Sequence, residues 1–326
     1  MPGMIVVRPT NGLCNRLCVV SSFAALARRC NRELHVCWTA SPGWSDEDLE
    51  DLFENRFPRF SADDFEQACA NALCLHAEVT VTGIGGLNEA WKYADGLGLA
   101  AVFDSSSHPV VTYWGFRPCQ DLLAPEDRRR LLPGFDRDFE AELRAWRPVG
   151  TIRERVAELA DAFSEDTVGV HIRRGDAIRH PRVAEQYRRS SDTAFMARMD
   201  RIVRSRPNSS FFLATDCFDT QQRFRDRYGS LILTNPDKRF VPSIYGAPKA
   251  NQQDAVIDLF ALARTRTILG SYYSTFSKTA AALGGARLKV VVEGSWLAQL
   301  RRMATLGRHE LIRRAKARAR RLTAAR

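Results

Sequence analysis

The sequence predicts an α/β protein made of two doubly wound parallel-sheet domains followed by a basic helical tail. Near the amino terminus, a strand, a polar loop, a helix and a second strand follow one another within residues 4–38, which is the start of a βαβ unit. After a linker at 147–150 that contains Pro and Gly, helical segments alternate with short apolar strands. Lys and Arg then concentrate in the last segment. We therefore expect a first domain over 1–147, a second over 148–300 and a tail over 301–326.

The first domain begins with a buried strand at 4–8, which a polar loop follows. Leu17, Val20 and Phe23 recur at helical spacing, so residues 16–29 are expected to form a helix. The segment 42–75 is less regular. We expect the remaining strands of this domain at 33–38, 77–82 and 109–114, and its remaining helices at 120–132 and 136–146.

The second domain shows a cleaner alternation of helix and strand. This pattern is typical of a parallel sheet with helices on both faces, the Rossmann-like arrangement. Its expected helices span 151–163, 191–205, 218–228, 250–264 and 275–284. They lead in turn to strands at 167–172, 210–214, 230–234, 266–269 and 287–292, and a last helix begins near 296.

The net charge of +10 is unevenly distributed. Residues 301–326 contain ten Lys and Arg against Glu310 alone, so the tail carries +9 and the rest of the chain about +1. Residues 308–322 fit an amphipathic helix that binds anionic lipid, but a solvated terminus without a partner and a nucleic-acid contact also fit. A nucleic-acid-binding protein is the least favoured class, because the body of the chain is nearly neutral.

Composition also excludes several classes of protein. With 45% hydrophobic residues the chain can bury a large core, yet no apolar run reaches the ~18 residues of a membrane-spanning helix. The amino terminus runs directly into a strand pattern and lacks the pattern of a signal peptide. The eight cysteines are not spaced as zinc ligands. We expect a cytoplasmic protein, at most peripheral at the inner face of the membrane.

The most informative segment is Gly169-Val-His-Ile-Arg-Arg-Gly-Asp176, in which an expected strand ends in two arginines, a glycine and an aspartate. Two guanidinium groups at a strand end cost several kcal/mol of desolvation unless an anion meets them. Arginine also matches phosphate oxygens in bidentate geometry. Arg173 and Arg174 are therefore candidates for binding a phosphate. An Arg–Asp ion pair that ties down the loop is the alternative.

Further polar residues follow the ends of other expected strands, where open parallel sheets bind their ligands. A glycine-containing turn, Asn11-Gly-Leu-Cys-Asn-Arg16, opens the first helix with free backbone amides. Thr215 and Asp216 end one strand, the hydroxyl-rich turn Gly270–Ser277 follows another, and Asp258 lies on an apolar helix. Taken alone, each of these could be a tight turn, a helix cap or a solvated surface residue.

In this order, the segments resemble the α1,2/α1,6 and protein-O-fucosyltransferase superfamily. Its members carry a G-G-x-G-N-Q/R-type loop after the first strand and an H-x-R-R-x-D motif on the first strand of the second domain. An A-T-D strand end and an acidic helix residue followed by S/T-F-S complete the pattern. The corresponding segments here are Asn11–Arg16, His171–Asp176, Ala214–Asp216, and Asp258 with Ser274–Ser277.

The resemblance implies a GT-B glycosyltransferase, with an acceptor-side first domain, that transfers fucose from GDP-fucose to a glycan or glycolipid with inversion. Arg173 and Arg174 would bind the pyrophosphate, His171 the nucleoside and Asp258 the guanine edge. The other donor-binding residues that it implies are Asn11, Gly12, Thr215, Asp216, Ser274, Thr275, Phe276 and Ser277. The catalytic candidates are Asn15, Arg173, Arg174 and Asp176.

The chain departs from the family pattern at two places. Asn11 and Cys14 stand where the family has glycines, and Pro181 stands where some relatives place a carboxylate. The base that takes the acceptor proton is therefore not assigned, and the candidates near the motif are Asp176, His180 and Glu185. A GT-B enzyme with another nucleotide sugar and a catalytically inactive nucleotide-binding relative are the alternative functions.

No metal or other cofactor is expected. Asp46-Glu-Asp48 and Asp136-Arg-Asp138 have the D-x-D form of a metal site, but both lie in helical, amphipathic surroundings. Two arginines can supply the positive charge that a departing diphosphate requires. GDP-fucose is therefore expected as the donor substrate, without a metal ion to bind it.

Overall fold

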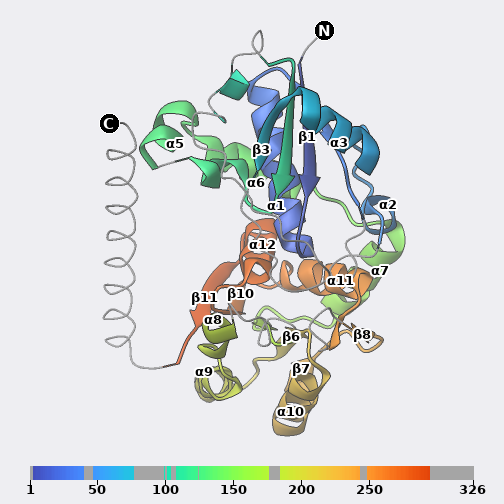
Figure 1. Ribbon diagram of the computed structural model, residues 1–326. Helices are drawn as coiled ribbons and strands as arrows, with labels where there is room; N and C mark the ends of the chain where they lie inside the picture. Colours follow the sequence, from blue (N-terminus) through green and yellow to red (C-terminus); the bar gives the residue numbers. More distant parts are fainter. Residues whose placement is uncertain are drawn as a thin grey trace.

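The computed structural model describes residues 3–39, 47–76, 99, 101–103, 108–123, 125–175, 184–242 and 248–293. The strand expected at 77–82, the catalytic candidate Asp176 and the tail after residue 300 lie outside the described residues. Two α/β units follow one another along the chain, one above the other in Figure 1. Both contain a parallel sheet, as the sequence predicts.

The first unit contains a sheet of four strands in the order β2-β1-β4-β3, all parallel. Its strands are β1 (Met4–Pro9), β2 (Glu33–Val36), β3 (Leu73–His76) and β4 (Val110–Gly115). Its helices are α1 (Leu13–Arg29), α2 (Leu49–Leu52), α3 (Ala62–Asn71), α5 (Pro125–Leu131) and α6 (Phe135–Arg144), with short 3₁₀ turns η1 (Ala101–Phe103) and η2 (Cys119–Leu122). The central strand β1 is buried because it carries the apolar run Ile5, Val6 and Val7, all fully buried.

Two expected helices of this unit differ from the structure. α1 begins at Leu13 rather than at residue 16, because the carbonyl of Gly12 accepts hydrogen bonds from the amides of Asn15 and Arg16. The helix expected at 120–132 is two elements, η2 and α5. Pro125 is the first residue of α5, a position that suits proline because its missing N–H needs no partner there.

The second unit contains a sheet of five parallel strands in the order β11-β10-β5-β6-β7. Its strands are β5 (Val168–Ile172), β6 (Phe211–Thr215), β7 (Ile232–Leu233), β10 (Thr267–Ser271) and β11 (Arg287–Val291). Its helices are α7 (Gly150–Asp161), α8 (Ala184–Arg188), α9 (Asp192–Ser205), α10 (Phe218–Tyr228), the 3₁₀ turn η3 (Gly229–Leu231), α11 (Gln252–Leu262) and α12 (Thr275–Gly284). A small antiparallel hairpin, β8 (Phe240–Pro242) and β9 (Pro248–Ala250), was not expected from the sequence.

Helices cover both faces of the second sheet. Phe195 of α9 and Phe224 of α10 pack against one face in a core of their own. α7, α11 and α12 lie on the other face, within a core that also includes Phe23 of α1 and Trp146. This larger core therefore joins the two units. The arrangement is that of two Rossmann-like domains, as the sequence predicts.

α11 and α12 lie between the two sheets in Figure 1, and α12 contacts α1 and α6 of the first domain. The Cys18 thiol of α1 is 3.6 Å from the Thr279 hydroxyl of α12. Among the described residues, no helix is long and apolar enough to cross a membrane. The domain boundary at 147/148 stays a prediction.

Candidate active site

The motif residues gather at one edge of the second sheet. From β5 the chain adds β6 and β7 on one side, then returns to add β10 and β11 on the other. The strand order therefore reverses between β5 and β10, and open α/β sheets bind ligands in a crevice beyond the carboxyl ends at such a point. We call the region beyond the carboxyl ends of β5 and β10 the crevice. His171 lies in β5 near its carboxyl end, Arg173 and Arg174 follow β5, and the turn that leads into α12 follows β10.

Arg173 is the partly exposed arginine of the pair, with 26% of its side chain accessible. Its guanidinium forms an ion pair with the buried carboxylate of Asp216, which follows β6. Its backbone amide donates to the Ser271 hydroxyl at 2.9 Å, so β5 and β10 are tied together at the crevice. Arg173 is thus held at the crevice with its side chain partly accessible to solvent.

Arg174 is buried, and it binds protein groups instead. Its Nε and Nη2 donate to one carboxylate oxygen of Asp192 at 3.1 and 2.6 Å. Nη2 also donates to the Ser190 carbonyl at 2.6 Å, and Nη1 donates to the Arg173 carbonyl at 2.8 Å. The Arg–Asp ion pairs of the alternative interpretation are therefore present for both arginines, Arg173 with Asp216 and Arg174 with Asp192. A phosphate role for Arg174 stays a prediction, and it would require this side chain to leave Asp192.

Asp216 organises both arginines. One carboxylate oxygen accepts the Arg174 amide at 2.7 Å, and the other pairs with the Arg173 guanidinium. Asp216 is 7% exposed and Thr215 is 2% exposed. The sequence predicted both as donor-binding residues. The structure places them directly beneath the arginine loop, where Asp216 fixes the loop's conformation.

His171 is locked between β5 and α12. Its Nδ1 lies 2.8 Å from the Ser277 hydroxyl, and its ring stacks on Phe276 with centroids 4.6 Å apart. Burial, together with the positive charges of Arg173, Lys238 and Arg174, lowers the pKa of His171 to about 3. This histidine is therefore neutral, so it can bind a nucleoside by hydrogen bonding and packing but does not supply a positive charge.

The turn after β10 presents the start of α12. Ser274 is buried at the cap position, Thr275 is exposed in the first turn, and no acidic residue lies in that turn. Gly270 allows α12 to approach closely, because a Cβ there would lie 2.6 Å from Ser277. The first turn of α12 begins at the same end of the sheet as Arg173 and has no negative side chain, as an anion-binding helix start requires.

Asp258 lies on α11 in a buried ion pair that sequence reasoning missed. Lys238 Nζ is 2.5 Å from Asp258 Oδ2 and donates to the Thr215 carbonyl at 3.2 Å. Asp258 Oδ1 is buried and has no hydrogen-bond partner. Burial raises the pKa of Asp258 to about 6, although Lys238 opposes the shift. The sequence around Lys238 does not indicate that it pairs with Asp258, because Lys238 lies in an irregular segment outside the helix that carries Asp258.

The loop of the first domain also has a special backbone. Asn11 has a φ of 67°, and Gly12 is the cap residue of α1, with open space where a Cβ would lie. Arg16 is fully buried and anchors this loop, with Nε donating to the Asn11 carbonyl at 3.0 Å and Nη1 to the Thr39 carbonyl at 2.9 Å. Asn15 is half-buried in the first turn of α1. Arg16 is a positioning residue that the motif contained but that we did not single out.

The D-x-D segments do not form a metal site among the described residues. Asp136 pairs with Arg128, and Asp138 pairs with Arg29. Asp46 lies outside the described part of the chain. No group of three His, Cys, Asp or Glu side chains that could hold a metal ion occurs in the described ranges. The absence of a metal from the reaction stays a prediction.

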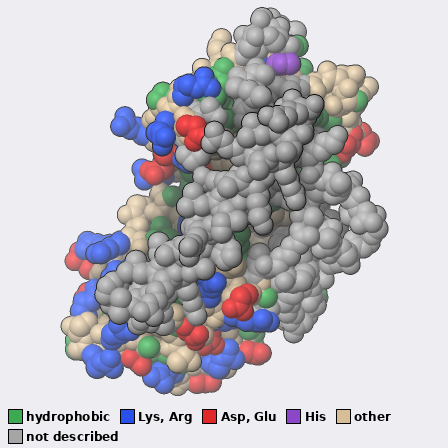
Figure 2. Space-filling view, turned by 60° about the vertical axis from the view of Figure 1, so that its left-hand side comes forward, with side chains coloured by type: hydrophobic (Ala, Val, Ile, Leu, Met, Phe, Trp, Pro, Cys, Tyr) green, Lys and Arg blue, Asp and Glu red, His purple; other side chains and the backbone are tan. Residues whose placement is uncertain are grey.

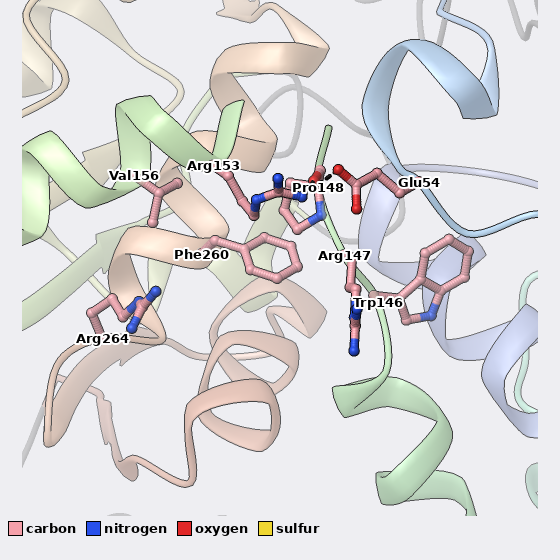
Figure 3. Close-up of a pocket in the computed structure, with 8 residues that line it drawn as sticks. All are labelled: Glu54, Trp146, Arg147, Pro148, Arg153, Val156, Phe260 and Arg264. Atoms are coloured by element: carbon pink, nitrogen blue, oxygen red, sulfur yellow. Dashed lines mark hydrogen bonds and ion pairs between the residues drawn. The ribbon is translucent and has the colours of Figure 1, made fainter. Parts of the chain in front are cut away.

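A hollow of about 470 Å³ lies elsewhere, at the linker between the domains (Figure 3). Phe260 of α11 projects into it, Arg147 and Trp146 lie on one side, and the Arg153–Glu54 ion pair closes another. The linker is fixed here, because the amide of Glu54 donates to the Arg147 carbonyl at 2.8 Å. None of the predicted site residues lines this hollow, so it is separate from the crevice at β5 and β10.

Comparison with known proteins gives a likeness of fold. Neither the family models nor the curated protein sequences match the chain. The structure is similar to FUT1 of Arabidopsis thaliana in complex with GDP, with a TM-score of 0.55, 14% identity and coverage of 91% of this chain and 71% of that one. It is also similar to POFUT1 in complex with GDP (TM-score 0.53, 14% identity, 89% and 99% coverage). The fucosyltransferase NodZ from Bradyrhizobium matches with a TM-score of 0.50, 16% identity and coverage of 86% and 93%.

These matches show that the chain shares its fold with solved fucosyltransferases, as the predicted resemblance implies. They cover most of the chain, so both domains share the architecture rather than one of them. At identities of 14–16% the likeness does not by itself transfer a substrate or a residue's role. The function has to be argued from the crevice.

Proposed function

We propose that this protein is an inverting fucosyltransferase that uses GDP-fucose to modify a glycan or glycolipid acceptor. The observation that carries the proposal is that a partly exposed Arg173 and the start of α12 lie at the same end of the second sheet, at the point where its strand order reverses. A guanidinium and free helix amides on one crevice are the groups that bind a diphosphate. The fold that the chain shares with fucosyltransferases supports the sugar class.

Asp258 supports guanine rather than uracil as the base. A carboxylate accepts hydrogen bonds from N1–H and N2–H of guanine, whereas it repels the O4 oxygen of uracil. Asp258 Oδ1 is a buried acceptor without a partner, while Oδ2 is held by Lys238. A buried acceptor of this kind costs free energy until a donor reaches it. The guanine edge would supply such donors.

The catalytic role of the crevice is to stabilise the leaving group. When the bond from the sugar to the β-phosphate breaks, negative charge builds on the departing GDP. Arg173 and the α12 amides are fixed before the reaction, Arg173 by Asp216 and Ser271, so they need little reorganisation. Removing one such donor costs about 3–4 kcal/mol of transition-state stabilisation.

Inversion requires the acceptor hydroxyl to attack from the side of the sugar opposite the departing GDP, so the base that takes its proton lies on that side. Asn15 of α1 is a candidate for orienting the acceptor, because an amide cannot act as a base at neutral pH. Asp176 and His180 lie outside the described residues, and Glu185 is an exposed residue of α8. We propose that the acceptor binds against the first domain and that Asp176, His180 or Glu185 is the base.

We propose a cytoplasmic enzyme whose tail contacts an anionic membrane surface, where lipid-linked acceptors would be available. Acidic and basic side chains are interspersed over the lower described surface in Figure 2, without a single-sign patch on that face. This mixture does not favour a nucleic-acid partner for that face. The alternatives are a GT-B enzyme with another nucleotide sugar and an inactive relative that binds a nucleotide.

The proposal is tested by GDP release. The full-length protein is incubated with GDP-fucose, and free GDP is measured with and without a mixed glycan preparation as acceptor. We expect slow hydrolysis alone and faster release with acceptor, with both lost in Arg173→Ala. Release from UDP sugars instead would favour the first alternative. GDP binding without release under either condition would favour the inactive relative.

A further inference from the structure

Tyr273 occupies an unfavourable backbone conformation at the edge of the crevice. The turn Ser271–Ser274 closes with a hydrogen bond from the Ser274 amide to the Ser271 carbonyl, at 3.4 Å. Tyr273 is the third residue of this turn and has a φ of 64°. Turns use Gly or Asn at such a position, because a bulky side chain is strained there. Strain of this kind persists where the side chain itself is needed, and that makes Tyr273 a candidate for function.

The side chain of Tyr273 is also unusually exposed. At 56% it is among the most exposed large hydrophobic side chains in the described part of the chain. A tyrosine kept only for the core would be buried. Instead its ring stands edge-on to Tyr187 of α8, with centroids 6.2 Å apart, and the Tyr187 hydroxyl donates to the Tyr273 carbonyl at 3.4 Å. The ring is therefore supported from one side and open on another.

The position of Tyr273 fits one part of the proposed donor. Along the carboxyl edge of the sheet, the Lys238–Asp258 pair lies at the end of β6, Arg173 at the end of β5 and Tyr273 after β10. Neighbouring strands are ~4.8 Å apart, so β6 and β10 are separated by about 10 Å. If guanine binds at Asp258 and the diphosphate binds at Arg173 and the start of α12, the sugar lies beyond the carboxyl end of β10, near Tyr273.

We propose that the Tyr273 ring is the wall against which the donor's sugar ring packs, and that it favours a 6-deoxy sugar. This inference rests on the proposed function. The C–H face of a pyranose and the methyl group of fucose are apolar, so they lose unfavourable contact with water against an aromatic ring. A sugar with a hydroxymethyl group at that position would bury a hydroxyl against the ring without a partner.

The test compares GDP with GDP-fucose by calorimetric titration. Tyr273→Asn removes the ring but tolerates the left-handed backbone, so we expect it to melt at or above the parent's temperature. GDP should bind within about twofold of the parent, whereas GDP-fucose should bind about five- to tenfold more weakly, the scale of losing one apolar sugar contact. Tyr273→Phe keeps the ring and should bind both as the parent does.

A matched control is Phe218→Ala, at the first residue of α10. Phe218 is 54% exposed, close to the value for Tyr273, but it follows β6 rather than β10. It should leave the ratio of the GDP to the GDP-fucose dissociation constant unchanged. If the parent and Tyr273→Phe bind GDP-fucose more tightly than GDP-L-galactose, which differs only by its 6-hydroxyl group, and Tyr273→Asn does not, the 6-deoxy selectivity is supported.

Three results would overturn the inference. If Tyr273→Asn keeps the parent's ratio of the two dissociation constants, the sugar does not pack on this ring. If the parent binds GDP-fucose no better than GDP, the crevice binds the nucleotide but has no wall for the sugar. If the parent binds neither ligand, the proposed function fails, and the assignment of Tyr273 fails with it.

Discussion

Replacing Arg173 with alanine should separate ligand binding from folding, because the two adjacent arginines have different surroundings. Arg173 is 26% exposed at its side chain and has Asp216 as its carboxylate partner. Losing a charge-assisted contact to a diphosphate costs about 2–4 kcal/mol, which is roughly a 30- to 1,000-fold weaker GDP affinity. Asp216 keeps its bond from the Arg174 amide, so the loss of folding stability should be about 1–3 kcal/mol.

Arg174→Ala should behave in the opposite way. It removes four hydrogen bonds of a buried guanidinium and leaves Asp192 with one cationic partner, Arg223. Breaking a buried pair of this kind costs about 3–5 kcal/mol of stability. We therefore expect a large fall in the urea midpoint, with weaker GDP binding only as a consequence of the disturbed loop.

The assay is calorimetric titration with GDP alongside urea unfolding for each variant. Arg266→Ala is the control, since Arg266 forms an exposed ion pair with Glu165 at the opposite end of the sheet. It should change neither quantity by more than about 0.5 kcal/mol. Wild-type GDP affinity in a folded Arg173→Ala protein would refute the assignment of the diphosphate site. Equal losses of binding in both variants, without a loss of stability in Arg174→Ala, would refute the division of roles.

Three further predictions concern pH, metals and the tail. The pKa of His171 is lowered to about 3 in the folded protein, so below pH 6.5 the unfolded chain binds a proton that the folded protein does not, and the free energy of unfolding falls. Between pH 7 and pH 5 this loss should be about 2 kcal/mol. Urea unfolding of His171→Phe should not show it. Release of GDP from GDP-fucose should persist in excess chelator, and a loss restored by manganese or magnesium would contradict the arginine-based site. Deleting residues 308–326 should leave the melting temperature and GDP binding unchanged but weaken binding to anionic vesicles, most strongly at low salt; a strongly destabilised core would instead mean that the tail packs on the body.

The periodic parts of the fold could be predicted because local pattern and tertiary environment agree. Fully buried strands such as β5 and β6 read as short apolar runs, and the helices between them bury one regular face. Pro125 suits the start of a helix, but the apolar spacing over 120–132 predicts one continuous helix and hides that start. The short hairpin of β8 and β9 carries little apolar alternation, so its pairing depends on tertiary contacts rather than on its own sequence.

The site could be predicted as a set of strand ends, but not as a network of partners. The H-x-R-R-G-D segment gave the position of both arginines, because the carboxyl ends of parallel strands share one edge. It could not distinguish their surroundings, since Asp192 and Asp216 come from other elements. Lys238 was missed for the same reason. Tyr273 lies within the turn Gly270–Ser277 that the sequence marks, but its positive φ is a property of the folded backbone.

The central claim is that the crevice at β5 and β10 binds a sugar linked to guanosine diphosphate. The most direct measurement is the melting temperature of the full-length protein with GDP, GDP-fucose, UDP-galactose and UDP-N-acetylglucosamine, each at the same concentration. We expect stabilisation by GDP and GDP-fucose alone, by about 2.7 kcal/mol at a hundred times the dissociation constant. The stabilisation should be absent in Arg173→Ala and retained in Arg266→Ala. Equal stabilisation by the UDP sugars, or none by any nucleotide, would contradict the account.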